Sequence, residues 1–284
     1  MDKYHQKEVI KITEIELIVR NLSKMIDYYT NSLGFQILTK NTDKVVLSVD
    51  KIHPLLTLIE NADAELRGKS IGLYHFALLL PSREELGKFL RHVIKNQIPI
   101  SGAANHGVSE AIYLQDPEDN GIEIYADTDD SGWYDEFGSL NMYTEELDYS
   151  GVYYEAKDSE PFSHLPNNTT LGHLHLSVSS LDKAKEFYID SIGFDVSYDQ
   201  ISSALFAGSN KYHHHLGMNT WFTKKPKSQF TTGLKSFVIR YPECEMILSA
   251  MKKLESKQYL IKEIDNGYQT TDFDGNTVYL QLES

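Results

Sequence analysis

The sequence predicts an α+β fold made of four related units, each a strand followed by a helix and three further strands. The main observation is an internal repeat, in which the run 22–35 is echoed without a gap by the run 181–194. Two weaker copies of the same order begin at Gly72 and Gly233. The chain of 284 residues has room for four such units of about 50–60 residues, numbered here one to four in chain order.

Units one and three carry the clearest signals. The runs 15–19 and 174–178 alternate apolar residues with others, which is typical of a strand with one buried face. The repeated stretches 22–35 and 181–194 are amphipathic and each reaches a glycine near its end, so we expect a helix in each.

Units two and four follow the same order with less similarity. The apolar runs 72–81 and 233–242 predict a first strand in each unit, and the stretches 83–95 and 243–257 predict the helix that follows. Each unit then ends in a pair of strands around a turn rich in Asp, Asn and Gly, at 116–121 and 272–276.

The two halves of the chain divide in the stretch 128–170. This stretch is acidic and rich in tyrosine, contains proline and has no clear period, so we expect a linker with some local structure. The predicted domains are therefore 8–127, which holds units one and two, and 171–284, which holds units three and four.

The charge of the chain argues against some partners. It has 27 basic and 41 acidic residues, a formal net charge of −14. Binding to nucleic acid requires a basic surface that meets the phosphates, so no nucleic-acid partner is expected. An anionic membrane surface is disfavoured for the same reason, and a small ligand is expected instead.

Three further features predict a cytoplasmic location. No run approaches the roughly 18 uninterrupted apolar residues of a membrane helix. The N-terminal residues lack the apolar stretch of a signal peptide. Cys244 is the only cysteine, which rules out an intrachain disulfide and fits a reducing compartment.

The four-unit order resembles the vicinal oxygen chelate superfamily, which includes glyoxalases, extradiol ring-cleaving dioxygenases and fosfomycin-resistance proteins. Five runs are similar to its bacillary catechol 2,3-dioxygenases and their hydroquinone-cleaving relatives: 72–81, 108–117, 120–127, 171–176 and 212–215. The resemblance implies that units pair into curved mixed sheets, the glyoxalase/dioxygenase fold. It also implies that each curved sheet can hold one metal ion, with ligands from the first and last strands of the paired units.

The resemblance lets the ligand positions be read unit by unit. The first-strand positions of units one to four hold Glu14, His75, His173 and Ser236, and the last-strand positions of units two and four hold Glu123 and Tyr279. Only units two and three together supply two histidines and a carboxylate. We therefore expect unit two to pair with unit three, so that the site straddles the middle of the chain.

His75, Glu123 and His173 form the predicted metal site. Two imidazoles and one carboxylate on one face suit Fe(II), because they leave open positions for substrate and O₂, and Mn(II) could use the same ligands. His175 lies two residues after His173 on the same strand face, and we expect it to contact substrate and not the metal.

Acid–base residues are expected from the run Tyr-His-His-His at 212–215. His214 best matches the position of the acid–base histidine in the resembled family, on the last strand of unit three, while His213 and His215 would project the other way. A shift of one residue would reverse this choice, so His215 stays among the expected substrate contacts. Trp221 and Phe206 are candidates for an aromatic pocket wall.

Two more residues are expected at the site. Tyr113 lies ten residues before Glu123, a spacing at which the resembled dioxygenases place a tyrosine that donates a hydrogen bond to a substrate hydroxyl. His106 lies close to where catechol-type relatives carry a histidine and hydroquinone-type relatives a cationic residue. Its role and the substrate class are therefore left open.

The resulting hypothesis is an Fe(II)-dependent extradiol-type dioxygenase that cleaves the ring of a small catechol or hydroquinone with O₂. One alternative is a glyoxalase-like isomerase or lyase, whose site would carry a fourth protein ligand. Another is a non-catalytic binding protein that sequesters a small molecule. The sequence leaves open whether the chain forms a homo-oligomer.

Overall fold

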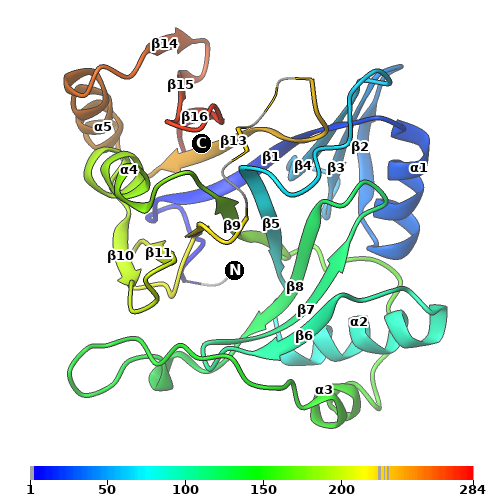
Figure 1. Cartoon of the computed structure of the whole chain (residues 1–284). Coiled ribbons are helices and arrows are strands. Elements are labelled where there is room, and N and C mark those ends of the chain that lie inside the picture. Colours follow the sequence, from blue (N-terminus) through cyan, green and yellow to red (C-terminus); the bar gives the residue numbers. More distant parts are fainter. Residues whose placement is uncertain (1–2, 223–224, 227, 229, 284) are drawn as a thin grey trace.

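The computed structural model describes residues 3–283 except 223, 224, 227 and 229. Two eight-stranded mixed sheets carry the fold, and the helices lie at the outside of the molecule (Figure 1). The predicted α+β fold of repeated strand–helix–three-strand units is confirmed.

Units one and four form one sheet, called here the first–fourth sheet, with the order β14-β15-β16-β13-β1-β4-β3-β2. Unit one comprises β1 (Lys11–Val19), α1 (Leu22–Asp27), η1 (Tyr28–Ser32), β2 (Gln36–Lys40), β3 (Lys44–Ser48) and β4 (Leu56–Glu60). Unit four comprises β13 (Gly233–Tyr241), α5 (Cys244–Ser256), β14 (Ile261–Ile264), β15 (Gly267–Thr271) and β16 (Thr277–Leu282). The two units meet where β1 runs antiparallel to β13.

Units two and three form the second–third sheet, with the order β10-β11-β12-β9-β5-β8-β7-β6. Unit two comprises β5 (Gly72–Leu79), α2 (Arg83–Asn96), β6 (Gly102–Asn105), β7 (Ser109–Gln115) and β8 (Gly121–Asp127). Unit three comprises β9 (Thr170–Ser177), α4 (Leu181–Ala184), η3 (Lys185–Ile192), β10 (Asp195–Tyr198), β11 (Ala204–Gly208) and β12 (Leu216–Asn219). Because β5 runs antiparallel to β9, unit two pairs with unit three, as predicted.

Each sheet therefore takes one unit from each half of the chain. One continuous apolar core joins residues of both sheets. The division into domains 8–127 and 171–284 follows the chain and stays a prediction, because the strand pairing crosses between these two stretches.

The helices of units one and three differ from the expected form. Each was predicted as one α-helix, but after a short α-helical start the chain widens into a π-helix, η1 in unit one and η3 in unit three. Each π-helix buries a tyrosine whose hydroxyl reaches the turn of the next unit: Tyr29 donates to Asp116 and Tyr188 to Asp272, at 2.8 and 2.6 Å. The same device thus ties unit one to two and unit three to four.

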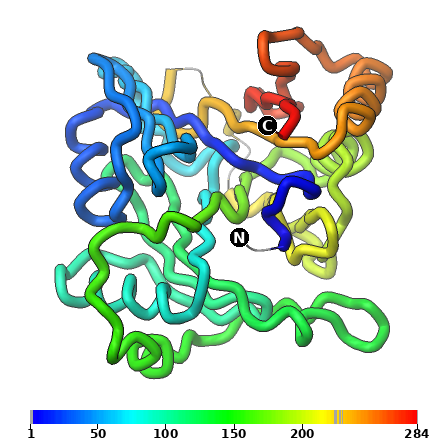
Figure 2. Tube along the Cα trace, turned by 180° about the vertical axis from the view of Figure 1, so that it is seen from behind, coloured from blue at the N-terminus to red at the C-terminus, as the bar shows by residue number. Residues whose placement is uncertain are grey.

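The segment between β8 and β9 contains two short helices, η2 (Asp130–Gly132) and α3 (Tyr149–Glu155). Its first part runs as an extended loop along the outside of the molecule (Figure 2). Its second part packs α3 against α2, where the carbonyl of Val152 lies so close to Gly87 that a β-carbon would not fit. None of the helices in the described part of the chain is both long and apolar enough to cross a bilayer.

Candidate metal centre and active-site cavity

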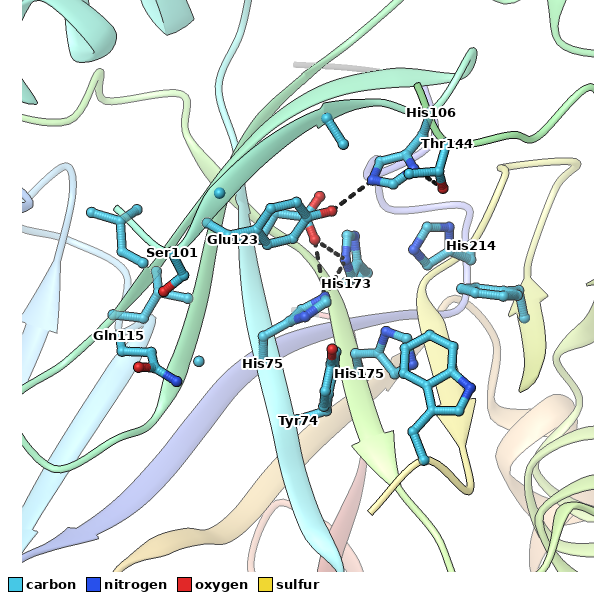
Figure 3. Close-up of a pocket in the computed structure, with 18 of the residues that line it drawn as sticks. Tyr74, His75, Ser101, His106, Gln115, Glu123, Thr144, His173, His175 and His214 are labelled. Atoms are coloured by element: carbon cyan, nitrogen blue, oxygen red, sulfur yellow. Dashed lines mark hydrogen bonds and ion pairs between the residues drawn. The ribbon is translucent and has the colours of Figure 1, made fainter. Parts of the chain in front are cut away.

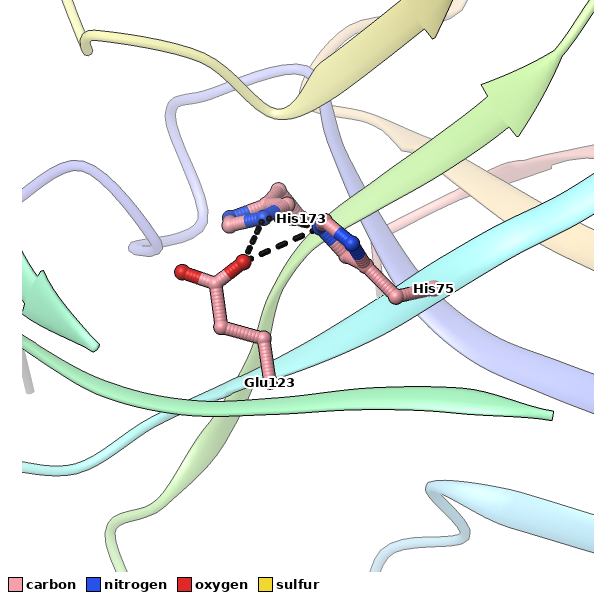
Figure 4. Close-up of side chains that lie close together, drawn as sticks. All are labelled: His75, Glu123 and His173. Atoms are coloured by element: carbon pink, nitrogen blue, oxygen red, sulfur yellow. Dashed lines mark hydrogen bonds and ion pairs between the residues drawn. The ribbon is translucent and has the colours of Figure 1, made fainter. Parts of the chain in front are cut away.

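Three side chains converge on one point of the second–third sheet. His75 comes from β5, Glu123 from β8 and His173 from β9 (Figure 4). Oε2 of Glu123 lies 3.0 Å from Nε2 of His75 and 3.2 Å from Nε2 of His173, and the two Nε2 atoms are 3.2 Å apart. The structure thus brings together the three residues that the sequence singled out, and they form a candidate metal-binding group.

The geometry of these atoms fits a divalent ion. Ligand atoms that occupy neighbouring corners of an octahedron, each about 2.1 Å from the metal, lie about 3 Å from one another. The three measured separations are close to that value. All three residues are buried, so a cation here would be shielded from bulk water on the side of the sheet.

The protonation states of Glu123 and His173 leave their donor atoms able to bind a metal ion. Burial alone would raise the pKa of Glu123, but the two imidazoles hold it well below its ordinary value, so the side chain is a carboxylate. Burial lowers the pKa of His173 to about 4, so its ring is neutral at pH 7 and keeps a lone pair for a metal.

The group opens into a cavity of about 890 Å³, which is large enough for a small aromatic ligand. Figure 3 shows His75, Glu123, His106, His175 and His214 around the same space. Part of the wall is aromatic and is built from Tyr74, Phe206, Trp221 and Phe222.

His175 lines the cavity without joining the metal-binding group. The side-chain oxygen of Asn219 accepts from Ser177 and from the backbone N–H of Trp221, so its amide nitrogen is turned to His175. That nitrogen donates to Nε2 of His175 at 3.0 Å. Because Nε2 is engaged in this way, His175 is held beside the metal-binding residues as a neighbour.

The three consecutive histidines differ from the predicted arrangement. They were expected on the last strand of unit three, but they precede β12, which begins at Leu216. His214 lines the cavity, whereas His213 and His215 do not. The expected substrate contact from His215 is therefore not seen: its ring packs inward, accepts from the backbone N–H of Ser209 and donates to the carbonyl of Tyr4.

Tyr113 and His106 form a pair at another part of the cavity wall. The Tyr113 hydroxyl lies 2.7 Å from Nε2 of His106, and Nδ1 of His106 lies 3.1 Å from the carbonyl of Tyr143. Nδ1 also lies 3.2 Å from the hydroxyl of Thr144, so three polar groups hold the ring of His106. Burial, with the charge of Glu123, raises the pKa of Tyr113 well above its ordinary value, so its hydroxyl stays protonated.

Tyr74 lines the cavity although it was not among the residues expected at the site. Strand alternation would turn Tyr74 away from the side that His75 faces. However, the pairing of β5 with β9 shifts register between Leu73 and His75, which is the mark of a β-bulge. The bulge lets two successive side chains, Tyr74 and His75, line one cavity. Nothing in the sequence alone signals this shift.

Comparisons with known proteins agree with this architecture. Residues 11–124 and 170–279 match the Glyoxalase/Bleomycin resistance protein/Dioxygenase superfamily. The chain is 41% identical over 263 residues to a protein named catechol-2,3-dioxygenase from Bacillus subtilis (strain 168), an alignment that covers 90% of this chain and 92% of the relative.

Two solved structures share the fold at low identity. An inferred dioxygenase from Bacillus subtilis has a TM-score of 0.64 and 11% identity, with 98% of this chain and 86% of that chain covered. Glyoxalase I from Zea mays has a TM-score of 0.59 and 15% identity, with 96% and 92% covered. The sequence matches show, and the fold agrees, that the chain belongs to the Glyoxalase/Bleomycin resistance protein/Dioxygenase superfamily.

Proposed function

We propose that this protein is an Fe(II)-dependent extradiol-type dioxygenase that cleaves the ring of a small catechol or hydroquinone. The observation that carries the proposal is the buried group of His75, Glu123 and His173 at one wall of an aromatic-lined cavity. Two imidazoles and one carboxylate, with the remaining positions open, are the ligand set of non-haem Fe(II) oxygenases. The similarity to the Bacillus subtilis relative named catechol-2,3-dioxygenase supports the same activity.

Bound iron would lower the pKa of the diol hydroxyls and supply the electrons that activate O₂. The proton that leaves the diol needs an acceptor in the cavity. His214 fits this role because it lines the cavity beside His173, with ring centroids 4.2 Å apart, and burial lowers its pKa, so the resting ring is neutral and keeps a lone pair for a proton. The same ring can return the proton later in the reaction.

Tyr113 would orient the substrate. Its hydroxyl is hydrogen-bonded to Nε2 of His106 and, beside the carboxylate of Glu123, stays protonated at the cavity wall. A protonated hydroxyl there can form a hydrogen bond with a substrate oxygen. His106 then acts by holding Tyr113, and its own Nδ1 is held by the carbonyl of Tyr143.

The aromatic wall would hold the ring of the substrate. Trp221 and Phe206 each contact the ring of His175, with centroids 5.6 Å apart in both pairs, and Tyr74 contacts Trp221 at 5.4 Å. Such a wall suits a flat apolar ligand that can stack or meet these rings edge to face.

The test is an oxygen-uptake assay on protein loaded anaerobically with Fe(II). Catechol, methylcatechols and methylhydroquinone are offered in turn, and at least one should consume O₂ in proportion to the product formed. A protein that retains one iron per chain and consumes no O₂ with any of them would overturn the proposal. As a control for the site, His75→Ala should no longer retain iron.

The two alternatives predict different outcomes in the same assay. A glyoxalase-like isomerase would prefer Zn(II) or Ni(II) and recruit a fourth protein ligand, whereas the group found among the described residues contains three. A sequestering protein would bind the diol without consuming O₂. Either result in place of oxygen uptake would favour that alternative.

A further inference from the structure

We propose that Asp127 and His213 are positioning residues for His214, and that they fix its tautomer so that Nε2 is unprotonated toward the cavity. This inference rests on the proposed ring-cleaving function only where it gives His214 the role of a base. The arrangement itself is a chain of two hydrogen bonds that runs outward from the cavity wall. It passes from His214 to His213 and ends at the carboxylate of Asp127.

The distances of the chain are those of ordinary hydrogen bonds. Nδ1 of His214 lies 2.8 Å from Nδ1 of His213, and Nε2 of His213 lies 2.9 Å from Oδ1 of Asp127. His213 is fully buried, and its ring is enclosed by Tyr212 and Trp133, with centroids 4.0 and 4.9 Å away. The ring of His213 therefore has little freedom to turn out of the chain.

The protons of the chain can be placed one at a time. The carboxylate of Asp127 only accepts, so Nε2 of His213 carries a proton. A neutral imidazole has one protonated nitrogen, so Nδ1 of His213 is an acceptor and Nδ1 of His214 must donate to it. Nε2 of His214 is then the nitrogen with a lone pair, and His214 lines the cavity. The resting ring is thus set up as a base.

A protonated His213 would reverse this assignment, because both its nitrogens would donate. His213 is fully buried and its ring centroid lies 4.7 Å from that of His214, so a charge on it would lie in the protein interior. We therefore take His213 as a neutral ring that Asp127 orients, and the NMR readout below tests this state directly.

Asp127 is suited to end the chain as an acceptor. It lies on β8 four residues after Glu123, so the strand that supplies the metal carboxylate also supplies this one. Its Oδ1 also accepts from the Tyr212 hydroxyl at 3.3 Å, and the Tyr212 and Tyr125 hydroxyls are 2.7 Å apart. Asp127 also lines a second cavity, with Ser82, Asn168 and Thr170, where its side chain is partly exposed. A partly exposed carboxylate loses less of its hydration than a fully buried one.

The tautomer can be read directly by ¹⁵N NMR on histidine-labelled full-length protein loaded with Zn(II), a diamagnetic ion. A protonated ring nitrogen and a bare one have widely separated ¹⁵N shifts. We expect His214 to show a protonated Nδ1 and a bare Nε2, and His213 the opposite pattern. A protonated Nε2 on His214, or a doubly protonated His213, would overturn the proposal. This readout does not depend on any enzyme activity.

Two variants test the chain at separate links. Asp127→Leu removes the final acceptor and His213→Phe removes the partner of His214, and in either we expect a protonated Nε2 to appear on His214. Asp127→Asn keeps an oxygen that can accept, so it should retain most of the wild-type pattern. Asn168→Ala, which changes the second cavity without touching the chain, is the matched control. Asp127→Leu and His213→Phe proteins that both fold and both keep the wild-type tautomer would contradict the proposal.

Kinetics of the iron-loaded protein give an independent readout. We expect Asp127→Leu to lower kcat between about tenfold and about a thousandfold, the range of a general acid–base contribution, with KM changed by less than about threefold. Asp127→Asn should recover part of the loss. If no ring cleavage is found but the tautomers are as stated, the proposed function fails and the positioning chain stands. If the enzyme is active and Asp127→Leu changes KM alone, the chain fails and the function stands.

Discussion

The first–fourth and second–third sheets have the same arrangement of strands and differ in the side chains at their ligand positions. Corresponding residues pair in corresponding ways: Ala77 pairs with His173 and with Glu123, and Val238 pairs with Glu14 and with Tyr279. In the same register His75 faces His175, and Ser236 faces Glu16. The backbone therefore offers the same three ligand positions twice.

At these positions the second–third sheet carries the candidate metal-binding group, whereas the first–fourth sheet carries ion pairs. In the first–fourth sheet Glu14 is paired with Arg240 at 2.9 Å, and Glu16 accepts from Ser236 at 2.7 Å. Lys44 and Lys235 also lie within 3.5 Å of Glu16. The positive charges that a metal would supply come here from the protein itself. The fold thus provides the same geometry in both sheets, whereas the choice of three side chains decides whether a cation is needed.

The largest effect that would separate the two sheets comes from removing the carboxylate ligand. Glu123→Ala should lower the affinity for Fe(II) by at least about a hundredfold and abolish the proposed ring cleavage. Mutation of an outer-shell partner of a metal ligand costs up to about a hundredfold, and loss of a direct ligand should cost more. Tyr279→Phe, at the corresponding position of the other sheet, should leave both unchanged. Metal content per chain after dialysis measures the difference, and a loss of metal from Tyr279→Phe would break the comparison.

In the metal-free protein, acid should destabilise the second–third sheet more than the first–fourth sheet. Burial holds the pKa values of His175, His214 and His215 well below the ordinary histidine value and lowers that of His173 to about 4. The unfolded chain, with histidine pKa values near about 6.5, binds protons that the folded chain cannot, so stability is lost as the pH falls from about 6.5 toward 4.

The strands of the first–fourth sheet, as the structure describes them, contain no histidine. Hydrogen exchange at pH 5 and pH 7 on metal-free protein should therefore show added opening in β5, β9 and β12, with little change in β1 and β13. Equal loss of protection in both sheets would show that the buried histidines do not localise the acid effect.

The repeated aspartate turns offer a comparison in which the sheets should behave alike. Asp116 and Asp272 are both buried, and each accepts from a tyrosine hydroxyl and from the side chain of Asn120 or Asn276. Asp116→Ala and Asp272→Ala should each lower the free energy of unfolding by about 2–4 kcal/mol, since each leaves several buried donors without an acceptor. Denaturant titration measures this.

The smallest expected effect comes from the tyrosines that reach these turns. Tyr29→Phe and Tyr188→Phe each delete one hydroxyl from a π-helix and should each cost about 1 kcal/mol. A loss of stability several times larger in one of the variants would indicate that the two π-helices, although matched in sequence, contribute unequally to the free energy of unfolding. The urea midpoints of the two variants, compared at equal m-value, provide the measurement.

The sequence was sufficient for the parts of the site that depend on the repeat. His75, Glu123 and His173 could be placed together because they occupy matching positions in units whose strand order is regular. The π-helices escaped prediction because a widened turn of five to eight residues leaves no distinct period in the sequence. Tyr74 escaped because a bulge changes its side without any sequence signature.

The partners of His214 could not be predicted for a different reason. His213 and Asp127 are separated in the chain by the whole segment 128–169 and by β9 to β11, and they meet although β9 and β5 lie between β12 and β8 in the sheet. Such a contact between distant segments depends on the final packing, not on local pattern. The three histidines also lie in irregular backbone, where strand alternation does not apply.

The pairing of β5 with β9 also fixes when the candidate metal site can form. His75 and Glu123 are synthesised before the segment 128–170, and His173 only after it, so an emerging chain carries two ligands and lacks the third until β9 leaves the ribosome and docks. A complete site therefore appears only once both halves of the chain have folded together. Unfinished chains therefore present only part of the candidate metal-binding group.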